Sequence, residues 1–159
     1  MVQRAVVIMG SKTDLDFSQK IRGALSEYSI SCDLRIASAH RTPEHLLKIL
    51  AEYSASGEEI IVLTVAGLSD ALSGVVAAQR LFPVVACPPD TDKLGFPKVF
   101  SSEFTPSDVP VAFINDPTKA AHFVAQVFAL TNHKIAQLIA NKLQDKKRQI
   151  VSMDAELKK

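Results

Sequence analysis

Cysteine is scarce in this sequence. The two residues present, Cys32 and Cys87, lie far apart and belong to no CxxC motif or metal-ligand spacing. Free, buried thiols are typical of a reducing compartment, so we expect a cytoplasmic protein, with a structural disulfide as the less favoured alternative. Three histidines also show no metal-ligand spacing and are interpreted as structural or surface residues: His45, His122 and His133. No metal site is predicted.

Neither an excess of charge nor a long apolar run is present. The 18 basic and 17 acidic residues give a formal net charge of +1, which creates no strong field to attract nucleic acid or an anionic membrane. No apolar run approaches the length that spans a bilayer. The apolar part of the N-terminal stretch MVQRAVVIMG is too short for a signal peptide. We therefore expect neither nucleic acid nor a membrane among the partners.

Repeats, low-complexity tracts and linkers are also missing, which predicts one domain over residues 1–159. Hydrophobic residues make up 47% of the chain and charged residues 22%, an ordinary globular composition. Short apolar runs alternate with segments of helical periodicity. The runs predict strands at 5–9, 31–37, 60–65, 83–86 and 111–114. The periodic segments predict helices at 14–28, 43–53, 70–81, 117–130 and 132–159.

This alternation predicts an α/β protein with an open, mostly parallel sheet and helices on both faces. The proline-containing stretch 88–110 is predicted to be an irregular loop, and long loops in compact domains are often functional. Ligands bind such sheets at the carboxyl ends of the strands, near a switch in strand order. Segments that directly follow strands should therefore meet at one edge: 10–11, 38–41, 66–67 and 87–88.

The first of these polar segments, MGSKTD (residues 9–14), follows the first predicted strand. Gly10 would let the backbone turn sharply. Free N–H groups at the start of the next helix, with the hydroxyls of Ser11 and Thr13, would form a phosphate cradle. Asp14 could accept hydrogen bonds from ribose hydroxyls. The segment matches neither a Walker loop nor the GxGxxG of a dinucleotide site, and a plain helix cap is its simpler interpretation.

The second segment, SAHRTP (residues 38–43), follows the second predicted strand. Ser38 and Arg41 could bind an anion, because the forked guanidinium suits a phosphate. His40 can transfer protons near neutral pH. A surface turn with a helix cap at Thr42 explains that threonine and the proline after it, but leaves the other three polar residues without a role. Chemistry alone leaves the two interpretations evenly matched.

The third segment, AGLSDALSG (residues 66–74), consists mainly of small residues, which allow a ligand to approach the backbone closely. A helix cap by Ser69 or Asp70 is the competing interpretation. The chain has no serine–histidine–aspartate order and no nucleophile elbow that would indicate a hydrolase.

The predicted C-terminal helix, about 132–159, is longer than one small sheet can cover. It carries an apolar stripe that continues weakly toward its end: Ile135, Leu138, Ile139 and Leu143, then Ile150 and Val151. A solvated tail that frays is one interpretation. We favour an oligomerisation arm on a neighbouring subunit, because an apolar stripe needs a partner surface.

Together, MGSKTD, SAHRTP and AGLSDALSG, in this order and near this spacing, resemble the PurE family of de novo purine biosynthesis. That family comprises aminoimidazole ribonucleotide carboxylases and carboxyaminoimidazole ribonucleotide mutases. The resemblance covers essentially the whole chain. It implies a flavodoxin-like three-layer fold, a homo-octamer, and no metal or organic cofactor. It also implies a nucleotide and carbon dioxide as the small-molecule partners.

The resemblance implies roles for single residues as well. His40 would be the general acid/base. Ser11, Asp14 and Arg41 would hold the phosphate and ribose of the nucleotide. The other expected substrate-binding residues are Gly10, Ser38, Ala39, Ala66, Gly67, Leu68 and Ser69.

The third segment distinguishes two branches of this family. The mutase branch typically reads AGGAAHLPG, and Ala71 and Ser73 stand in place of its histidine and proline. The carboxylase branch typically reads AGRSNALSG, and this chain keeps most of that pattern, with Leu68 for the arginine and Asp70 for the asparagine. Arg41 also stands where that branch usually has lysine. The chain is therefore closer to the carboxylase that uses carbon dioxide directly. A mutase and a non-catalytic nucleotide-binding module are the alternatives.

Overall fold

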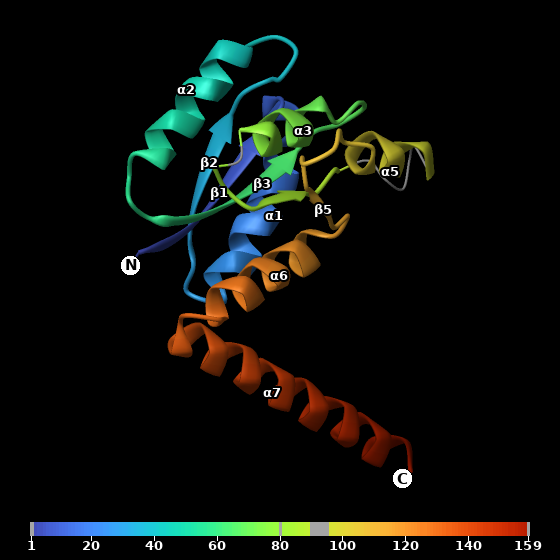
Figure 1. Ribbon diagram of the computed structural model, residues 1–159. Coiled ribbons are helices and arrows are strands. Elements are labelled where there is room, and N and C mark those ends of the chain that lie inside the picture. Colours follow the sequence, from blue (N-terminus) through green and yellow to red (C-terminus); the bar gives the residue numbers. More distant parts are fainter. Residues whose placement is uncertain (1, 80, 90–95, 159) are drawn as a thin grey trace.

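A five-stranded parallel sheet forms the middle of the computed structural model, which describes residues 2–79, 81–89 and 96–158 (Figure 1). Its strands are β1 (Gln3–Met9), β2 (Ser31–Ile36), β3 (Glu59–Val65), β4 (Val84–Ala86) and β5 (Ala112–Phe113). They lie in the order β2-β1-β3-β4-β5, and every pair is parallel. The predicted parallel sheet is confirmed, and its strand order switches at β1.

Helices cover both faces of this sheet (Figure 1). α1 (Leu15–Ser26) and α6 (Pro117–Ala129) pack side by side on one face. α2 (Pro43–Ser54) and α3 (Ala71–Ala78) lie on the other. The predicted flavodoxin-like three-layer α/β fold is confirmed. Helix ends differ from the predicted ones by a few residues, and a short 3-10 helix, η1 (Lys12–Asp14), precedes α1.

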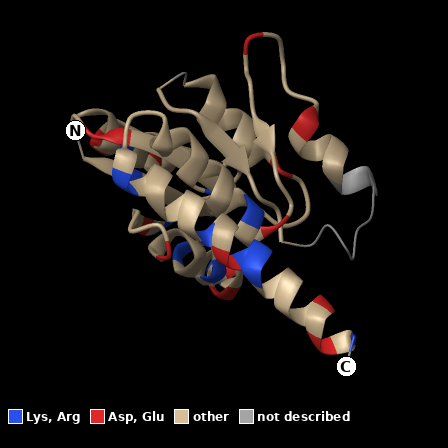
Figure 2. Ribbon diagram, turned by 90° about the horizontal axis from the view of Figure 1, so that it is seen from below, with Lys and Arg blue, Asp and Glu red and all other residues tan. Residues whose placement is uncertain are grey.

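The C-terminal helix α7 (His133–Leu157) extends away from the rest of the chain, which confirms the predicted long helix (Figure 1). Ile135 is buried in the core near α1 and α6. Figure 2 shows basic and acidic residues along the projecting part of α7, with uncharged stretches between them. Several of the apolar side chains there are exposed: Leu143, Ile150, Val151, Met153 and Leu157. In the part of the chain that the structure describes, no helix is both long and apolar enough to cross a membrane.

Polar contacts set the direction in which α7 leaves the sheet. Gln3 in β1 donates through Nε2 to the Glu59 carboxylate at 2.7 Å and accepts at Oε1 from Asn132 Nδ2 at 3.0 Å. Asn132 is the N-cap residue of α7. Farther along, Lys142 forms an ion pair with Glu27 just beyond α1. The first half of α7 is therefore tied to both the sheet and the α1 layer.

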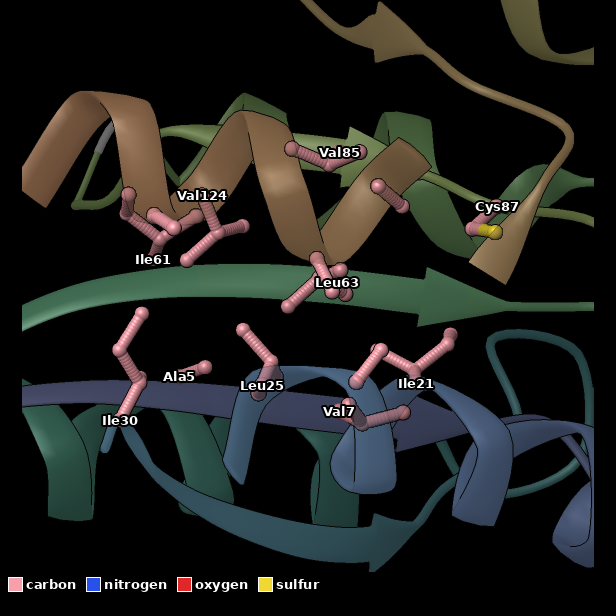
Figure 3. Close-up of a cluster of buried hydrophobic side chains, with 14 of the residues drawn as sticks. Ala5, Val7, Ile21, Leu25, Ile30, Ile61, Leu63, Val85, Cys87 and Val124 are labelled. Carbon is pink, nitrogen blue, oxygen red and sulfur yellow. The ribbon is translucent and has the colours of Figure 1, made fainter. Parts of the chain in front are cut away.

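Two hydrophobic clusters, one on each side of the sheet, form the core. Successive strand residues point to opposite faces. Val7 and Leu63 therefore pack toward α1 and α6, and Figure 3 shows them with Leu25 and Val124. Val6 belongs to the other cluster, under α2 and α3. Burial on both faces explains why β1 and β3 are continuous apolar runs.

The stretch 88–110 contains a helix that the sequence pattern did not predict. α5 (Phe96–Glu103) lies beside α3 (Figure 1). The prediction of an irregular loop is wrong for these residues, and residues 90–95 lie outside the described part. A proline favours a loop in a sequence-based prediction. Pro97 lies in the first turn of α5, where backbone N–H groups have no partner within the helix, so the proline removes no hydrogen bond.

Two neighbouring leucines of α2 test this assignment of the core. Leu46 is fully buried, whereas Leu47 is 43% exposed. Leu46→Ala should lower the free energy of unfolding by about 2–5 kcal/mol, because it removes buried contacts and leaves a cavity. Leu47→Ala is the matched control and should cost less than about 1 kcal/mol. Urea unfolding followed by circular dichroism measures both, and equal losses would contradict the described packing of α2.

Candidate active site

The loops after β1, β2 and β3 meet at the carboxyl edge of the sheet, because β1 pairs with both other strands. This pairing continues into the loops. The Gly10 N–H donates to the Val65 carbonyl at 2.9 Å, and the Ala37 N–H donates to the Met9 carbonyl at 3.0 Å. Ligands of open α/β sheets bind at such a switch point. A cavity of about 570 Å³ opens between the three loops.

Every residue predicted for the site lines this cavity, although the roles of these residues stay predictions. The set is Gly10, Ser11, Asp14, Ser38, Ala39, His40, Arg41, Ala66, Gly67, Leu68 and Ser69. Thr13 and Leu72 also line it and are absent from the predicted set. The hydroxyl of Thr13 is recognisable in the sequence as a possible phosphate ligand, whereas Leu72 resembles an ordinary apolar residue of a helix. The predicted segment 87–88 is not part of the lining, because β3 separates β4 from β1.

The first loop is held by its own short helix. Ser11 Oγ accepts from the Thr13 N–H at 3.3 Å and so caps η1. The capping interpretation is confirmed for Ser11, although this residue also lines the cavity. The backbone bends at Gly10, as predicted, but it does so without a left-handed φ. A Cβ atom at Gly10 would lie 3.9 Å from the Val65 carbonyl oxygen, an ordinary contact, so the missing side chain mainly leaves the cavity open.

The second loop is held by hydrogen bonds between its ends. Thr42 Oγ1 accepts from the Ser38 N–H at 2.9 Å and donates to the Ser38 carbonyl at 3.3 Å. The predicted cap of α2 by the Thr42 side chain is wrong, because this hydroxyl acts within the turn. His40 and Arg41 are exposed at the cavity. Among the described residues neither side chain forms a hydrogen bond or ion pair, so both are available to a ligand.

The third loop contains a strained residue. Leu68 has a φ of 53° and is 77% exposed at the cavity. A left-handed conformation in a residue other than glycine costs about 1–3 kcal/mol, and such strain is concentrated at functional sites. Asp70, two residues later, accepts from the Ser73 N–H at 3.1 Å and caps α3. The capping interpretation is therefore confirmed for Asp70.

Each of the three loops leads into a helix beside the cavity. η1 and then α1 follow the first loop, α2 follows the second, and α3 follows the third. The N–H groups of a first helical turn have no partner within the helix, and the helix dipole is positive at this end. Arg41 adds a full positive charge. The cavity is therefore suited to a small anionic ligand such as a phosphate ester.

Of the four histidines, all within the described residues, His40 alone lines the cavity. His122 Nδ1 lies 2.9 Å from the Tyr28 hydroxyl, which agrees with a structural role. His45 and His133 are exposed elsewhere on the surface. In the described part of the chain, no three His, Cys, Asp or Glu side chains gather in a way that could hold a metal ion.

Both cysteines are free thiols, as predicted. Cys87 is buried and Cys32 is half-buried. Burial raises the pKa of each thiol to about 12. Neither thiol lines the cavity, so neither is a candidate nucleophile for it.

A parallel sheet of this strand order, with a polar cavity at its switch point, defines a flavodoxin-like α/β protein with a small-molecule site. A family model described as AIR carboxylase matches residues 4–149. The chain belongs to this family, which acts in purine biosynthesis, and the resemblance stated from the sequence is confirmed.

Individual relatives agree with this assignment. The phosphoribosylaminoimidazole carboxylase of Archaeoglobus fulgidus is 43% identical, over 98% of this chain and 85% of its own length. The N5-carboxyaminoimidazole ribonucleotide mutase of Methanocaldococcus jannaschii is 32% identical, over 96% of both chains. The crystal structure of a Treponema denticola PurE2 variant matches with a TM-score of 0.95 and 32% identity, over 100% of both chains. Both branches of the family are thus present among the relatives.

The raised pKa values predict that both thiols react slowly. At pH 8, a thiol with a pKa of about 12 holds about a thousandfold less thiolate than an ordinary cysteine. Iodoacetamide should therefore label the native chain far more slowly than the chain in urea. The labelling rate of the native chain should still rise with pH at about pH 10, because this pH lies below the pKa of both thiols. Mass spectrometry measures the labelling, and equal rates in the native and unfolded chains would contradict the described burial.

Proposed function

We propose that the protein carboxylates 5-aminoimidazole ribonucleotide reversibly with carbon dioxide, giving 4-carboxy-5-aminoimidazole ribonucleotide, without a metal or organic cofactor. The observation that carries this proposal is the presence of His40 in one cavity with residues of all three polar segments. The name of the Archaeoglobus fulgidus relative supports the reaction. The carboxylase-like pattern of AGLSDALSG supports the choice of branch.

The phosphate and ribose would bind between the first two loops. Arg41 offers a forked, permanently charged donor, and Ser11 offers a hydroxyl. Asp14 would accept hydrogen bonds from the ribose hydroxyls. The starts of α1 and α2 favour the phosphate charge. Three further residues would lie close to the nucleotide: Gly10, Ser38 and Ala39. These contacts would hold the ring in place, and much of the rate would come from this positioning.

The reaction requires that the ring and carbon dioxide be held in the correct positions, and it requires one proton acceptor. The aminoimidazole ring is electron-rich, and its enamine-like C4 forms a bond to the carbon of carbon dioxide. One C=O electron pair of carbon dioxide becomes the carboxylate charge. His40 then takes the proton from C4, and the C–H electron pair restores the aromatic ring. In the reverse direction His40 returns the proton and the C–C bond breaks. Histidine suits this role because its pKa ordinarily lies near neutral pH.

The third loop would enclose the carbon dioxide. Ala66, Gly67 and Leu68 would form a close, apolar wall over C4, which keeps water away from the electrophile. Backbone N–H groups or the Ser69 hydroxyl would stabilise the new carboxylate. Because Leu68 stands where the carboxylase branch has arginine, only neutral donors would stabilise this carboxylate.

A mutase is the second candidate function, because the Methanocaldococcus jannaschii relative carries that name. His40 and the same nucleotide site would then act on the N-carboxy form of the nucleotide. That carbamate would lose carbon dioxide, which the cavity would retain until C4 captured it. Ala71 and Ser73 stand where the mutase branch typically has histidine and proline, so we favour the carboxylase.

We also propose a single domain that assembles in the cytoplasm as a homo-oligomer, with an octamer as the expected size. Exposed apolar residues of α7, among them Ile150 and Val151, support the assembly, because such a surface favours burial against a partner. Free thiols support a reducing compartment.

The proposed proton transfer depends on His40. His40→Asn should lower kcat by about a hundredfold or more while nucleotide affinity changes by less than about threefold, because the variant removes a proton acceptor and no binding charge. The control, His45→Asn, alters an exposed histidine outside the cavity and should keep wild-type kcat. Ultraviolet absorbance of the product measures kcat, and calorimetry measures affinity. Near-normal turnover in His40→Asn would exclude the proposed role.

A paired assay separates the two candidate reactions. One sample contains aminoimidazole ribonucleotide with bicarbonate-equilibrated carbon dioxide, and the other contains fresh carbamate with carbon dioxide depleted. We expect faster product formation in the first sample, because the third segment follows the carboxylase pattern. Product mainly in the second sample would identify a mutase. Tight nucleotide binding without product in either sample would identify a non-catalytic binding module.

The proposed arm predicts an effect of charge on assembly. Ile150→Asp places a carboxylate on the exposed apolar part of α7 and should shift the chain to a smaller species in sedimentation velocity, because burying that charge is unfavourable. Gln149→Asp adds the same charge to the neighbouring polar position and serves as the control. A monomeric wild-type chain, or equal behaviour of both variants, would contradict the arm.

A further inference from the structure

Asp70 belongs to the third loop but is directed away from the cavity. It is 3% exposed and is not part of the lining, whereas its neighbours Leu68, Ser69 and Leu72 all are. A buried carboxylate requires hydrogen-bond donors. One donor is the Ser73 N–H, 3.1 Å from Asp70 Oδ1, at the start of α3. Helix capping explains this contact, but it occupies only one of the two carboxylate oxygens.

The second oxygen is bound by α5. The Ser102 hydroxyl donates to Asp70 Oδ2 at 2.7 Å, and Ser102 is 1% exposed. Beside it, the Asp70 backbone N–H donates to Ser101 Oγ at 2.6 Å. Two consecutive serines of α5 therefore bind the side chain and the backbone of one residue. These hydrogen bonds join the wall of the cavity to α5. The helix α5 lies beside α3 (Figure 1).

The loop next to Asp70 needs such a restraint. Leu68 holds a left-handed φ of 53°, a conformation that persists only where the surrounding structure imposes it. A cap alone would restrain α3 and not the loop before it. The paired bonds to Ser101 and Ser102 hold the backbone at position 70, two residues from the strained position. Because a carboxylate accepts stronger hydrogen bonds than a neutral oxygen does, Asp70 is well suited to this anchor.

We propose that Asp70 is a positioning residue for the carboxylation, and that it anchors the cavity wall 67–69 to α5 through Ser102. The inference rests on the proposed function of the cavity. The expected phosphate and ribose contacts lie on the other two loops. Loosening the anchor should therefore disturb the reacting end of the nucleotide, so kcat falls while KM for the nucleotide stays nearly constant. A misplacement of about 1 Å can cost about a hundredfold in rate, so we expect at least about a tenfold loss.

Three variants test the anchor. Ser102→Ala removes the hydroxyl without touching the cavity and should give the loss in kcat. Asp70→Asn keeps the cap acceptor and offers an amide N–H to the Ser102 oxygen, so it should retain most of kcat. Ser73→Ala is the matched control. Its hydroxyl is also buried and donates to the Asp70 carbonyl at 3.4 Å, but among the described residues it forms no hydrogen bond with α5 and should leave kcat near wild type.

The measurement is kcat per nucleotide-binding site, with the number of sites taken from calorimetry, so that partial unfolding does not imitate a slower reaction. A tenfold loss in Ser102→Ala, with unchanged KM and with activity retained in Asp70→Asn and Ser73→Ala, supports the anchor. Wild-type kcat in Ser102→Ala overturns it. If that variant does not fold, Ser102→Cys, which keeps only a weak donor, replaces it with the same expectation.

Failure of the proposed function is recognised separately. If the wild-type chain turns over neither substrate of the paired assay, the carboxylation is excluded. Amide hydrogen exchange then tests the anchor alone. Faster exchange at 66–70 in Ser102→Ala, with α2 unchanged, supports the anchor, and unchanged exchange at 66–70 overturns it.

Discussion

Parallel pairing of β1 with both β2 and β3 is the constraint on which the site depends. Parallel strands in one sheet end at the same edge, so this pairing brings together three loops that are far apart in the sequence. The backbone bonds of Gly10 and Ala37 extend the ladder one residue past β1 and β2, which fixes the point where each loop begins. A shift of one residue would also send Val7 and Leu63 to the wrong face of the sheet. The packing of the core and the geometry of the site therefore both depend on the same pairing register of the strands.

The loops at this edge are stabilised in two ways. The first two hold themselves through short-range bonds, such as the pair between Ser38 and Thr42, and leave His40 and Arg41 exposed at the cavity. The third contains little but small residues and a strained leucine, and Asp70 connects it to α5 over a long range in the sequence. Local bonds make a turn rigid by itself, whereas a long-range contact makes it depend on a second element. The position of the third loop therefore depends on α5, a helix that follows it in the sequence and lies outside the described cavity lining.

The helix α7 lies apart from the cavity. Ile135 and the contacts of Asn132 with Gln3 tie the start of this helix to the core, on the side of α1 and α6. The cavity lies at the carboxyl edge, and no residue of α7 lines it. The described lining of the cavity comes from the three loops, while the exposed apolar end of α7 projects from the body (Figure 1). The proposed reaction and the proposed association would therefore involve different parts of one fold.

Local pattern in the sequence determined the strands, most helices and the layered architecture, because side-chain periodicity and turn chemistry act over a few neighbouring positions. It also placed three polar segments directly after strands, but the choice of His40 and the other cavity residues as a site depended on the resemblance of these segments to a known family. Only the tertiary structure decided the strand order, since pairing partners are set by packing between distant segments. It also decided that Thr42 closes a turn instead of capping α2, and that residues 96–103 form a helix. The bond between Asp70 and Ser102 has no local signature, because its partners are 32 residues apart and meet only after α3 and α5 have packed.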